Sequence, residues 1–339
     1  MGRSLNELLV KAAVDPDALG RLLTEPEAAM AAAGVDESDR ELMRTGDVRP
    51  LLAQLWDSFS KTLPAEQQPE ADYWKENPHP AVAAPHGSLT VVGTGVRSVG
   101  QLTVEAISQI KRADRVFYLV AEPVAAQVIR TLNPAGSQSL ADLYKEGKLR
   151  GRTYREMVER ILASVRCGWR TCAVFYGHPG VFVRPAHEAI RQARAEGFEA
   201  EMLAGVSAED CLFADLGLDP ATSGCQSYEA TDFLINRRRV DPTSHLILWQ
   251  VGVLGDPTFS LTVRKCNAFE LLVKSLSKTY PLEHPLCVYE AAVLPGCKPL
   301  VRWVPLGQIG EAHLSIISTL YVPPSEPPRF DPELYVALS

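Results

Sequence analysis

From Gly87 onward, short apolar runs alternate with helical segments, and this alternation limits the possible folds more than any other feature of the sequence. Leu89–Gly93 and Arg115–Val120 are typical of strands, and the segment between them, Thr103–Ala113, is typical of a helix. A further strand is expected over Thr171–Tyr176. This order is typical of a mostly parallel sheet with helical crossover connections. We therefore predict an α/β fold for this region.

The pattern changes after about Leu216, where strands follow one another with fewer helices between them. The strands expected there are His245–Gln250, Leu286–Tyr289, Leu300–Val304 and Thr319–Val322. We therefore expect two α/β subdomains, over residues 87–215 and 216–324, and a tail over residues 325–339.

Residues 1–57 are expected to form a small all-α domain that precedes the α/β region. The apolar residues of its first helix recur at helical spacing, namely Leu5, Leu8, Leu9 and Ala12. Asp15 and Asp17 suit a helix start, and Pro26 opens another helix, because proline is tolerated in the first turn. A last short helix is expected over Val48–Trp56.

Glycines and prolines mark where these helices end and where a linker follows. Gly34 and Gly46 come after apolar periodic runs, as C-terminal caps do. Residues 58–86 hold five prolines among polar residues: Pro64, Pro69, Pro78, Pro80 and Pro85. Such a composition resists packing, so a Pro-rich linker is expected there.

Composition excludes several classes of protein. Hydrophobic residues make up 46% of the chain, which is enough to fill a core, so disorder is not expected. The formal net charge is −7, and the basic excess of a nucleic-acid-binding protein is missing. The sequence holds neither a run of about 18 apolar residues that could span a membrane nor a signal peptide. Its seven cysteines form no CxxC pair, which argues against a disulfide framework and a zinc site and favours the cytoplasm.

Two loops that follow expected strands suit a ligand. Gly93 and Gly95 permit a sharp turn and a close backbone approach, but their spacing is not GxGxxG, and a plain strand-to-helix turn explains them equally well. His178 follows a strand, where ligands of open α/β sheets bind. The competing interpretation of His178 is a loop histidine with an ordinary hydrogen bond.

Two further positions could serve either structure or chemistry. Ser207, with Asp210 three residues later, nearly matches a capping box, and a helix N-terminus can also hold a ligand. Arg150 and Tyr154 are four residues apart and would share a helix face, downstream of Tyr144. Tyr154 also begins an apolar stripe, so core packing is the alternative role for it; the stripe is Met157, Val158, Ile161, Leu162 and Val165.

Long segments between Gly87 and Pro324 closely resemble the borosin peptide α-N-methyltransferases of the tetrapyrrole-methylase superfamily. These segments are Gly87–Gly95, Val174–Phe182, Gly205–Asp215, Tyr228–Leu234, Ser244–Gly252 and Ser318–Pro324. The N-terminal 57 residues resemble the helical recognition domain of borosin precursors, which in fused fungal examples follows the catalytic domain instead of preceding it. One family tyrosine is missing, because the loop after Tyr144 is short.

The resemblance implies a tetrapyrrole-methylase-like fold of two subdomains, with S-adenosylmethionine between them and S-adenosylhomocysteine as the product. The positions that it assigns to the cofactor are Gly93, Gly95, Tyr176, His178, Val181, Phe182, Ser207, Ala208, Tyr228, Ala291 and Thr319. The catalytic positions are Tyr144, Arg150, Tyr154 and Tyr176. The resemblance also implies a homodimer and no metal, and the seven histidines show no close ligand spacing.

A backbone amide is a poor nucleophile, because its lone pair is delocalised into the carbonyl group. The hypothesis is that Tyr154 acts as general base with Arg150 favouring its phenolate, while Tyr144 or Tyr176 binds the amide oxygen. The substrate would be a separate precursor or the chain's own tail, Tyr335–Ser339. Two alternatives remain: a methyltransferase for a tetrapyrrole-like small molecule, and a largely non-catalytic module that binds a precursor.

Overall fold

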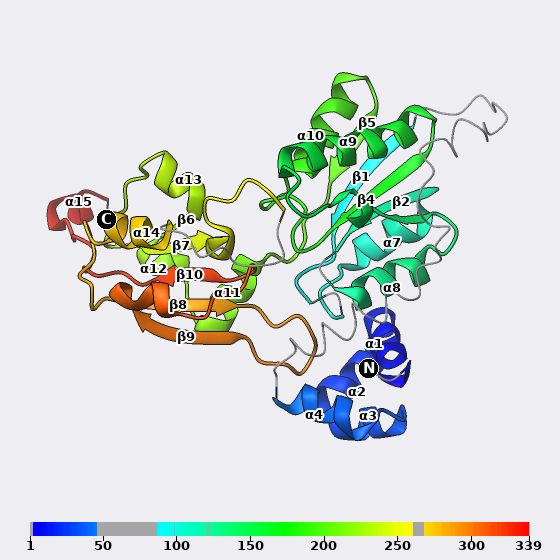
Figure 1. Cartoon of the computed structure of the whole chain (residues 1–339), viewed down its shortest axis with the longest axis horizontal. Coiled ribbons are helices and arrows are strands. Elements are labelled where there is room, and N and C mark those ends of the chain that lie inside the picture. Colours follow the sequence, from blue (N-terminus) through cyan, green and yellow to red (C-terminus); the bar gives the residue numbers. More distant parts are fainter. Residues whose placement is uncertain (1–2, 46–86, 98, 121, 260–267, 339) are drawn as a thin grey trace. The chain divides into compact units, whose positions relative to one another are not determined.

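The computed structural model describes residues 3–45, 87–97, 99–120, 122–259 and 268–338. It divides into two compact units, drawn in Figure 1, which comprise Met1–Cys211 with Ala292–Lys298, and Leu212–Ala291 with Pro299–Ser339. The helix expected over Val48–Trp56, the cap expected at Gly46 and the linker expected over residues 58–86 lie outside the described residues. The domain boundaries expected from the sequence remain predictions.

A five-stranded sheet forms the centre of the first unit, in the order β3-β2-β4-β1-β5, and every neighbouring pair in it is parallel. Its strands are β1 (Ser88–Gly93), β2 (Arg115–Leu119), β3 (Ser137–Ser139), β4 (Arg170–Phe175) and β5 (Glu199–Met202). The expected α/β fold is confirmed, and β1, β2 and β4 each end within one residue of the expected positions. The two edge strands, β3 and β5, are not among the expected strands.

Helices pack on this sheet and bury its apolar strands, as parallel sheets require. They are α7 (Val104–Arg112), α8 (Pro123–Leu132), α9 (Arg150–Arg166) and α10 (Arg184–Ala195), with a short 3-10 helix, η2 (Ala141–Leu143), ahead of α9. Side chains of α9 and α10 form one core cluster with β1, β2 and β4. The stripe expected on α9 is confirmed, because its five residues are at most 3% exposed. Burial of each large member stabilises the fold by about 1.5–3 kcal/mol, so α9 is firmly held.

Within residues 3–45, the first unit contains four short helices: α1 (Arg3–Val14), α2 (Pro16–Thr24), α3 (Pro26–Ala32) and α4 (Glu37–Thr45). α1 packs against α2 and α8, and its Leu5 and Leu9 are fully buried. Asp15 caps α2, because its Oδ1 accepts hydrogen bonds from the backbone N of Asp17 and Ala18 at 3.0 and 3.2 Å. Gly34 follows α3 with a φ of 70°, as expected of a C-terminal cap.

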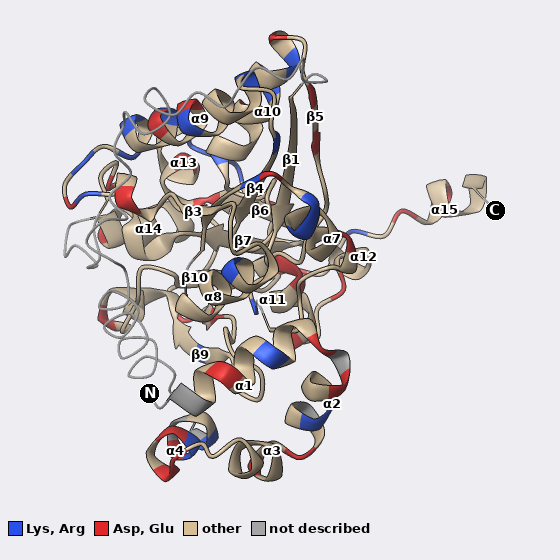
Figure 2. Cartoon of the chain, turned by 90° about the vertical axis from the view of Figure 1, so that its right-hand side faces the viewer, with Lys and Arg blue, Asp and Glu red and all other residues tan. Residues whose placement is uncertain are grey.

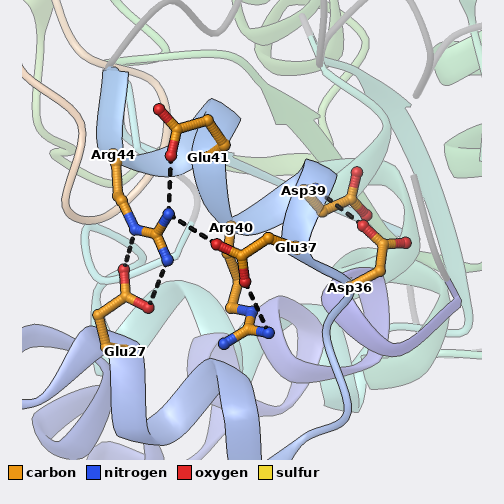
Figure 3. Close-up of polar contacts among 7 residues, drawn as sticks. All are labelled: Glu27, Asp36, Glu37, Asp39, Arg40, Glu41 and Arg44. Carbon is orange, nitrogen blue, oxygen red and sulfur yellow. Dashed lines mark hydrogen bonds and ion pairs between the residues drawn. The ribbon is translucent and has the colours of Figure 1, made fainter.

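Arg44 on α4 forms ion pairs with three carboxylates, as Figure 3 shows. Its Nε and Nη2 bind the two oxygens of Glu27 on α3 at 2.5 and 3.0 Å. Its Nη1 binds Glu37 at 2.8 Å and Glu41 at 2.7 Å. These side chains are well exposed and therefore screened by solvent, so the cluster joins α3 to α4 but adds little net stability.

The second unit is built on another five-stranded sheet, in the order β6-β7-β10-β8-β9. Its strands are β6 (Cys225–Glu229), β7 (His245–Trp249), β8 (Pro285–Glu290), β9 (Leu300–Pro305) and β10 (Thr319–Val322). The pair β6–β7 is parallel, whereas the other three pairs are antiparallel. The four expected strands are present, and β6 was not among them.

The helices of the second part of the chain are α11 (Ala208–Leu216), α12 (Pro220–Ser223), α13 (Ala230–Ile235), α14 (Ala268–Leu276) and α15 (Pro332–Leu338), with 3-10 helices η3 (Val251–Val253) and η4 (Leu306–Glu311). Side chains of α13, α14 and η4 form one core cluster with this sheet. Among the described helices, none has the length and apolar character needed to cross a bilayer. Figure 2 shows basic and acidic residues interspersed along α9 and α4, so neither helix presents a single sign of charge.

Candidate functional site

Three loops meet at the carboxyl ends of β1, β4 and β5. A Cβ atom at Gly93 would lie 2.0 Å from the carbonyl oxygen of Gly177, and one at Gly205 would lie 3.3 Å from the same oxygen. Gly95, at a φ of 70°, exchanges backbone hydrogen bonds with Gly177 at 3.2 and 3.0 Å. Glycine is therefore required at Gly93 and Gly95 for the turn and for the close packing of these loops on one another.

The loop after β4 is shaped by its two histidines. The Nδ1 of His178 accepts a hydrogen bond from the backbone N of Gly180 at 2.9 Å, so a neutral His178 carries its proton on Nε2. The Nε2 of His187 lies 2.8 Å from the carbonyl oxygen of Gly180. Val181 donates its backbone N–H to the carbonyl of His178, and Phe182 follows with a φ of 57° and a side chain that is 45% exposed. A positive φ is costly for an aromatic residue and is a common mark of ligand-binding loops.

Ser207 forms the expected capping box with Asp210. Its Oγ accepts a hydrogen bond from the backbone N of Asp210 at 3.1 Å, and the Asp210 carboxylate binds the backbone N and Oγ of Ser207, both at 2.7 Å. Ala208 is the first residue of α11. The structural role of Ser207 is thus confirmed, while a cofactor role for Ser207 and Ala208 stays a prediction.

Tyr144, Arg150 and Tyr154 are brought together beside the first sheet. Tyr144 follows η2, Tyr154 lies one turn into α9, and both pack against the core cluster under α9. The hydroxyls of Tyr144 and Tyr154 are hydrogen-bonded to each other. Burial raises the pKa of Tyr144 most, the charge and hydrogen bond of Tyr154 raise it further, and the nearby Arg150 opposes both. The packing role considered for Tyr154 is thus confirmed, while its catalytic role stays a prediction.

Tyr176 follows β4 and donates its backbone N–H to the carbonyl of Leu119 at the end of β2, at 3.1 Å. Burial raises the pKa of the Tyr176 hydroxyl, and the negative charges of Glu122 and Cys211 raise it further. Glu122 is 2% exposed and caps α8, because its Oε2 accepts the backbone N–H of Val124 at 2.9 Å. Sequence reasoning missed Glu122; its position after a strand and before Pro123 was the available signal.

Most of these groups share one edge of one sheet. All five strands are parallel, and Gly93 is the last residue of β1. The other four residues come after the ends of β2, β3, β4 and β5, namely Glu122, Tyr144, Tyr176 and Ser207 respectively. The carboxyl edge of a parallel sheet is where ligands of open α/β folds bind. The arrangement can hold a ligand against backbone and place phenolic hydroxyls and a guanidinium group beside it.

The remaining cofactor positions lie on the second unit, at one edge of its sheet. Tyr228 is near the end of β6, Ala291 follows β8, and Thr319, which is 4% exposed, begins β10. Arg238 lies 5.7 Å from the ring centre of Tyr228. Glu290 holds the loop before Thr319, because its Oε1 accepts hydrogen bonds from Ser315 and Ser318 at 2.6 and 2.5 Å; these positions remain predictions as cofactor ligands.

Comparison with curated proteins finds borosin-type relatives. The chain is 46% identical over 244 residues to the methyltransferase/ribosomally synthesized cyclic peptide lentinulin A precursor of Lentinula edodes, covering 71% of this chain and 58% of that protein. It is 46% identical over 242 residues to the corresponding omphalotin A precursor of Omphalotus olearius, covering 70% and 58%. A type I borosin cyclic peptide precursor of Mycena rosella is 41% identical over 256 residues, covering 74% and 64%. The chain thus spans roughly three fifths of the length of these relatives, and the resemblance to borosin-type methyltransferases is confirmed.

Two solved structures with a similar fold are methyltransferases. The uroporphyrin-III-C-methyltransferase from Thermus thermophilus matches with a TM-score of 0.51 and 20% identity, covering 71% of this chain and 93% of that one. The cobalt precorrin-4 methyltransferase of cobalamin biosynthesis matches with a TM-score of 0.52 and 16% identity, covering 73% and 98%. The model of the family Tetrapyrrole (Corrin/Porphyrin) Methylases matches residues 88–301. Since this match covers more than half of the 339 residues, the chain belongs to the tetrapyrrole methylase family.

Proposed function

We propose that this protein uses S-adenosylmethionine to methylate backbone amide nitrogens of a ribosomally made peptide in a borosin pathway. The observation that carries the proposal is the hydrogen bond between Tyr144 and Tyr154 close to Arg150. A tyrosine with such partners suits the role of a general base that removes the proton from the peptide amide. The names of the curated relatives, which are methyltransferases fused to cyclic peptide precursors, support the same conclusion.

The chemical problem is the low nucleophilicity of an amide nitrogen. Its lone pair is shared with the carbonyl, so the amide must lose a proton or shift toward an imidate before it can attack a methyl group. Tyr154 would accept that proton as general base. Tyr154 is hydrogen-bonded to Tyr144, and Arg150 lies close enough for its charge to act on Tyr144, so the proposed base has polar partners.

The amide oxygen gains negative charge as the proton leaves, and it needs a donor. Tyr144 is already hydrogen-bonded to Tyr154, so Tyr176 is the better of the two tyrosines proposed for this role. A tyrosine hydroxyl is protonated near neutral pH, and burial raises the pKa of Tyr176 further, so this phenol can act as an oxyanion-hole donor.

The cofactor supplies an electrophilic methyl group on a sulfonium ion. The loops of the first unit would receive it, because they lie at the carboxyl ends of parallel strands and Phe182 offers an exposed ring there. Gly93, Gly95 and Gly205 let these loops pack closely on one another. His178 would present its Nε2 proton to the cofactor, since its Nδ1 is occupied by Gly180. Ser207, Ala208, Tyr228, Ala291 and Thr319 complete the proposed set.

The substrate would be a separate precursor or the chain's own tail. α15 carries exposed apolar side chains that no core covers, namely Leu334, Tyr335, Val336 and Leu338, each at least 57% exposed. α15 would have to unwind before its backbone nitrogens could be methylated, because helical N–H groups such as that of Tyr335 are hydrogen-bonded. The proposal includes a homodimer, as the family resemblance implies, that acts in the cytoplasm, as the cysteine content favours.

Titration calorimetry with S-adenosylmethionine and S-adenosylhomocysteine, on the full chain, tests the cofactor part. Binding of both, weakened at least tenfold by Gly93→Ala, is expected. The peptide part is tested with a synthetic peptide of residues 325–339 and the same cofactor, with the site of methylation read by tandem mass spectrometry. Cofactor binding with methylation only of a tetrapyrrole such as uroporphyrinogen would favour the small-molecule alternative, and absence of cofactor binding would favour a non-catalytic module.

A further inference from the structure

We propose that Lys148 is a positioning residue of this active site, because its ammonium group joins the loop that carries Tyr144 to the helix that carries Tyr154. The assignment rests on the proposed function, in which the two tyrosines act on the peptide amide. Lys148 itself does not touch the reacting atoms, and it acts through Tyr144.

The ammonium group of Lys148 has two partners, one on each side. Its Nζ donates to the carbonyl oxygen of Leu143, the residue before Tyr144, at 2.8 Å. The same Nζ binds Oε2 of Glu156 at 2.5 Å, and Glu156 lies two residues after Tyr154 on α9. One cation therefore ties the backbone next to the first tyrosine to the helical turn that holds the second.

A second ion pair holds the other end of the same loop. Arg160 on α9 binds both oxygens of Asp142 with Nη1 and Nη2, at 2.8 and 2.9 Å. Asp142 precedes Tyr144 by two residues and Lys148 follows it by four, so the loop is fastened to α9 on both sides of the tyrosine. A paired guanidinium–carboxylate contact adds geometric precision to the anchoring.

The loop that follows Tyr144 is not held by apolar packing. Lys145, Glu146 and Gly147 are exposed, and they border a cavity of about 590 Å³ together with Lys148 and Arg152. A loop that borders open space and has few apolar contacts opens at low free energy unless polar contacts hold it. The two ion pairs are therefore the main restraint on the residues that follow Tyr144.

Lys148 and Arg152 both bind Glu156, but they differ in burial. The side chain of Lys148 is 16% exposed, whereas that of Arg152 is 71% exposed and contacts Glu156 at 3.2 Å. Solvent and salt screen an exposed pair far more than a half-buried one. The Lys148 hydrogen bond is also the main reason that the pKa of Glu156 lies below its usual range. Arg152 has the same partner without the link to Leu143, which makes it the matched control.

The first arm compares Lys148→Met with Arg152→Met, using the full chain, S-adenosylmethionine and a synthetic peptide of residues 325–339. Methionine keeps the apolar stem of each side chain and removes the charge. Because a loosened catalytic group costs rate, Lys148→Met is expected to lower kcat about tenfold and Arg152→Met by less than about twofold. Cofactor affinity, measured by calorimetry, is expected to stay the same in both variants, since neither residue is a cofactor position.

The second arm asks whether Lys148 acts through Tyr144. In a Tyr144→Phe background the hydrogen bond to Tyr154 is already lost, so Lys148→Met is expected to lower kcat no further. Equal losses with and without the Tyr144 hydroxyl would show a merely structural role and would overturn the proposal.

A third arm needs no activity. Hydrogen exchange of the amides of residues 144–149 is expected to be about tenfold faster in Lys148→Met and unchanged in Arg152→Met, because only the former contact restrains the loop. Unchanged exchange in Lys148→Met overturns the assignment. Faster exchange in Lys148→Met alone, together with a wild-type chain that methylates nothing, would mean that the proposed function fails while the restraint by Lys148 stands.

Discussion

The hydroxyls of Tyr144 and Tyr154 are hydrogen-bonded to each other, although the two residues come from different elements. Tyr144 follows the 3-10 helix η2, and Tyr154 lies on α9, yet both pack against the same core cluster. The contact places a polar pair at the edge of an apolar core, where a hydrogen bond is stronger than in water. It gives the proposed general base a hydrogen-bonding partner that is itself held by packing.

Tyr154→Phe is expected to lower the methylation rate about 10²–10⁴-fold, the range that removal of a general base produces. The ring and its packing against the core cluster are kept, so the thermal midpoint should stay within a few degrees of the wild type. Single-turnover methylation of the peptide of residues 325–339 measures the effect. An undiminished rate in the variant would rule out Tyr154 as the base.

Gly93→Ala is expected to weaken S-adenosylmethionine binding at least tenfold, because the new Cβ would lie 2.0 Å from the carbonyl oxygen of Gly177 and must displace the loop. Gly20→Ala in α2 is the matched control, since a Cβ there meets nothing within 4 Å. The control should bind the cofactor like the wild type and gain about 0.4–1 kcal/mol of stability. Equal affinity of all three proteins in calorimetry would show that the Gly93 loop does not bind the cofactor.

Ser207→Ala is expected to lower the free energy of unfolding by about 0.5–2 kcal/mol through loss of the cap on α11. Urea unfolding measures this cost. Thr103→Ala provides a comparison, because Thr103 caps α7 with a single bond to the backbone N of Ala106 at 3.0 Å. If Ser207 also binds the cofactor, only Ser207→Ala will weaken S-adenosylmethionine binding. Equal affinity of the two variants would leave Ser207 with its structural role alone.

Alkaline pH is expected to destabilise the fold through Cys172 on β4. Burial raises the pKa of its thiol from the ordinary 9.0 to about 12, so the folded chain keeps a proton that the unfolded chain releases. Stability from this group is complete below pH 9.0 and is lost as pH rises toward about 12. The slope is at most about 1.4 kcal/mol per pH unit for one group.

Cys172→Ala removes this term without adding charge, so the variant is expected to lose less stability than the wild type between about pH 8 and about pH 10. The free energy of unfolding of both proteins is measured in urea at both pH values. The difference between their losses is due to Cys172, because the other buried groups that titrate are the same in the two proteins. Parallel losses in the two proteins would refute the assignment.

The fold could be predicted where the chain is strongly apolar. β10 has the expected bounds, and β1 and β4 differ from expectation by one residue, because buried strands are continuous apolar runs. β3 and β5 were missed, since their sequences, Ser-Gln-Ser and Glu-Ala-Glu-Met, are polar and lie at sheet edges. Such strands form because a neighbour offers backbone hydrogen bonds, which no local pattern reveals.

Some features of the candidate site could likewise be predicted from the sequence, and others could not. The Ser207–Asp210 capping box and the helical stripe that starts at Tyr154 depend on local spacing, and both could be predicted. By contrast, the hydrogen bond between Tyr144 and Tyr154 and the burial of Glu122 depend on how separate elements pack. Neither could be predicted from the spacing of residues along the chain.

The most direct measurement is tandem mass spectrometry of the full chain and of an added peptide of residues 325–339, after incubation with S-adenosylmethionine that carries a deuterated methyl group. We expect labelled methyl groups on backbone nitrogens of the wild-type sample and none in the Tyr154→Phe sample. Labelled methyl groups on side chains alone, or an equal backbone label in Tyr154→Phe, would contradict it.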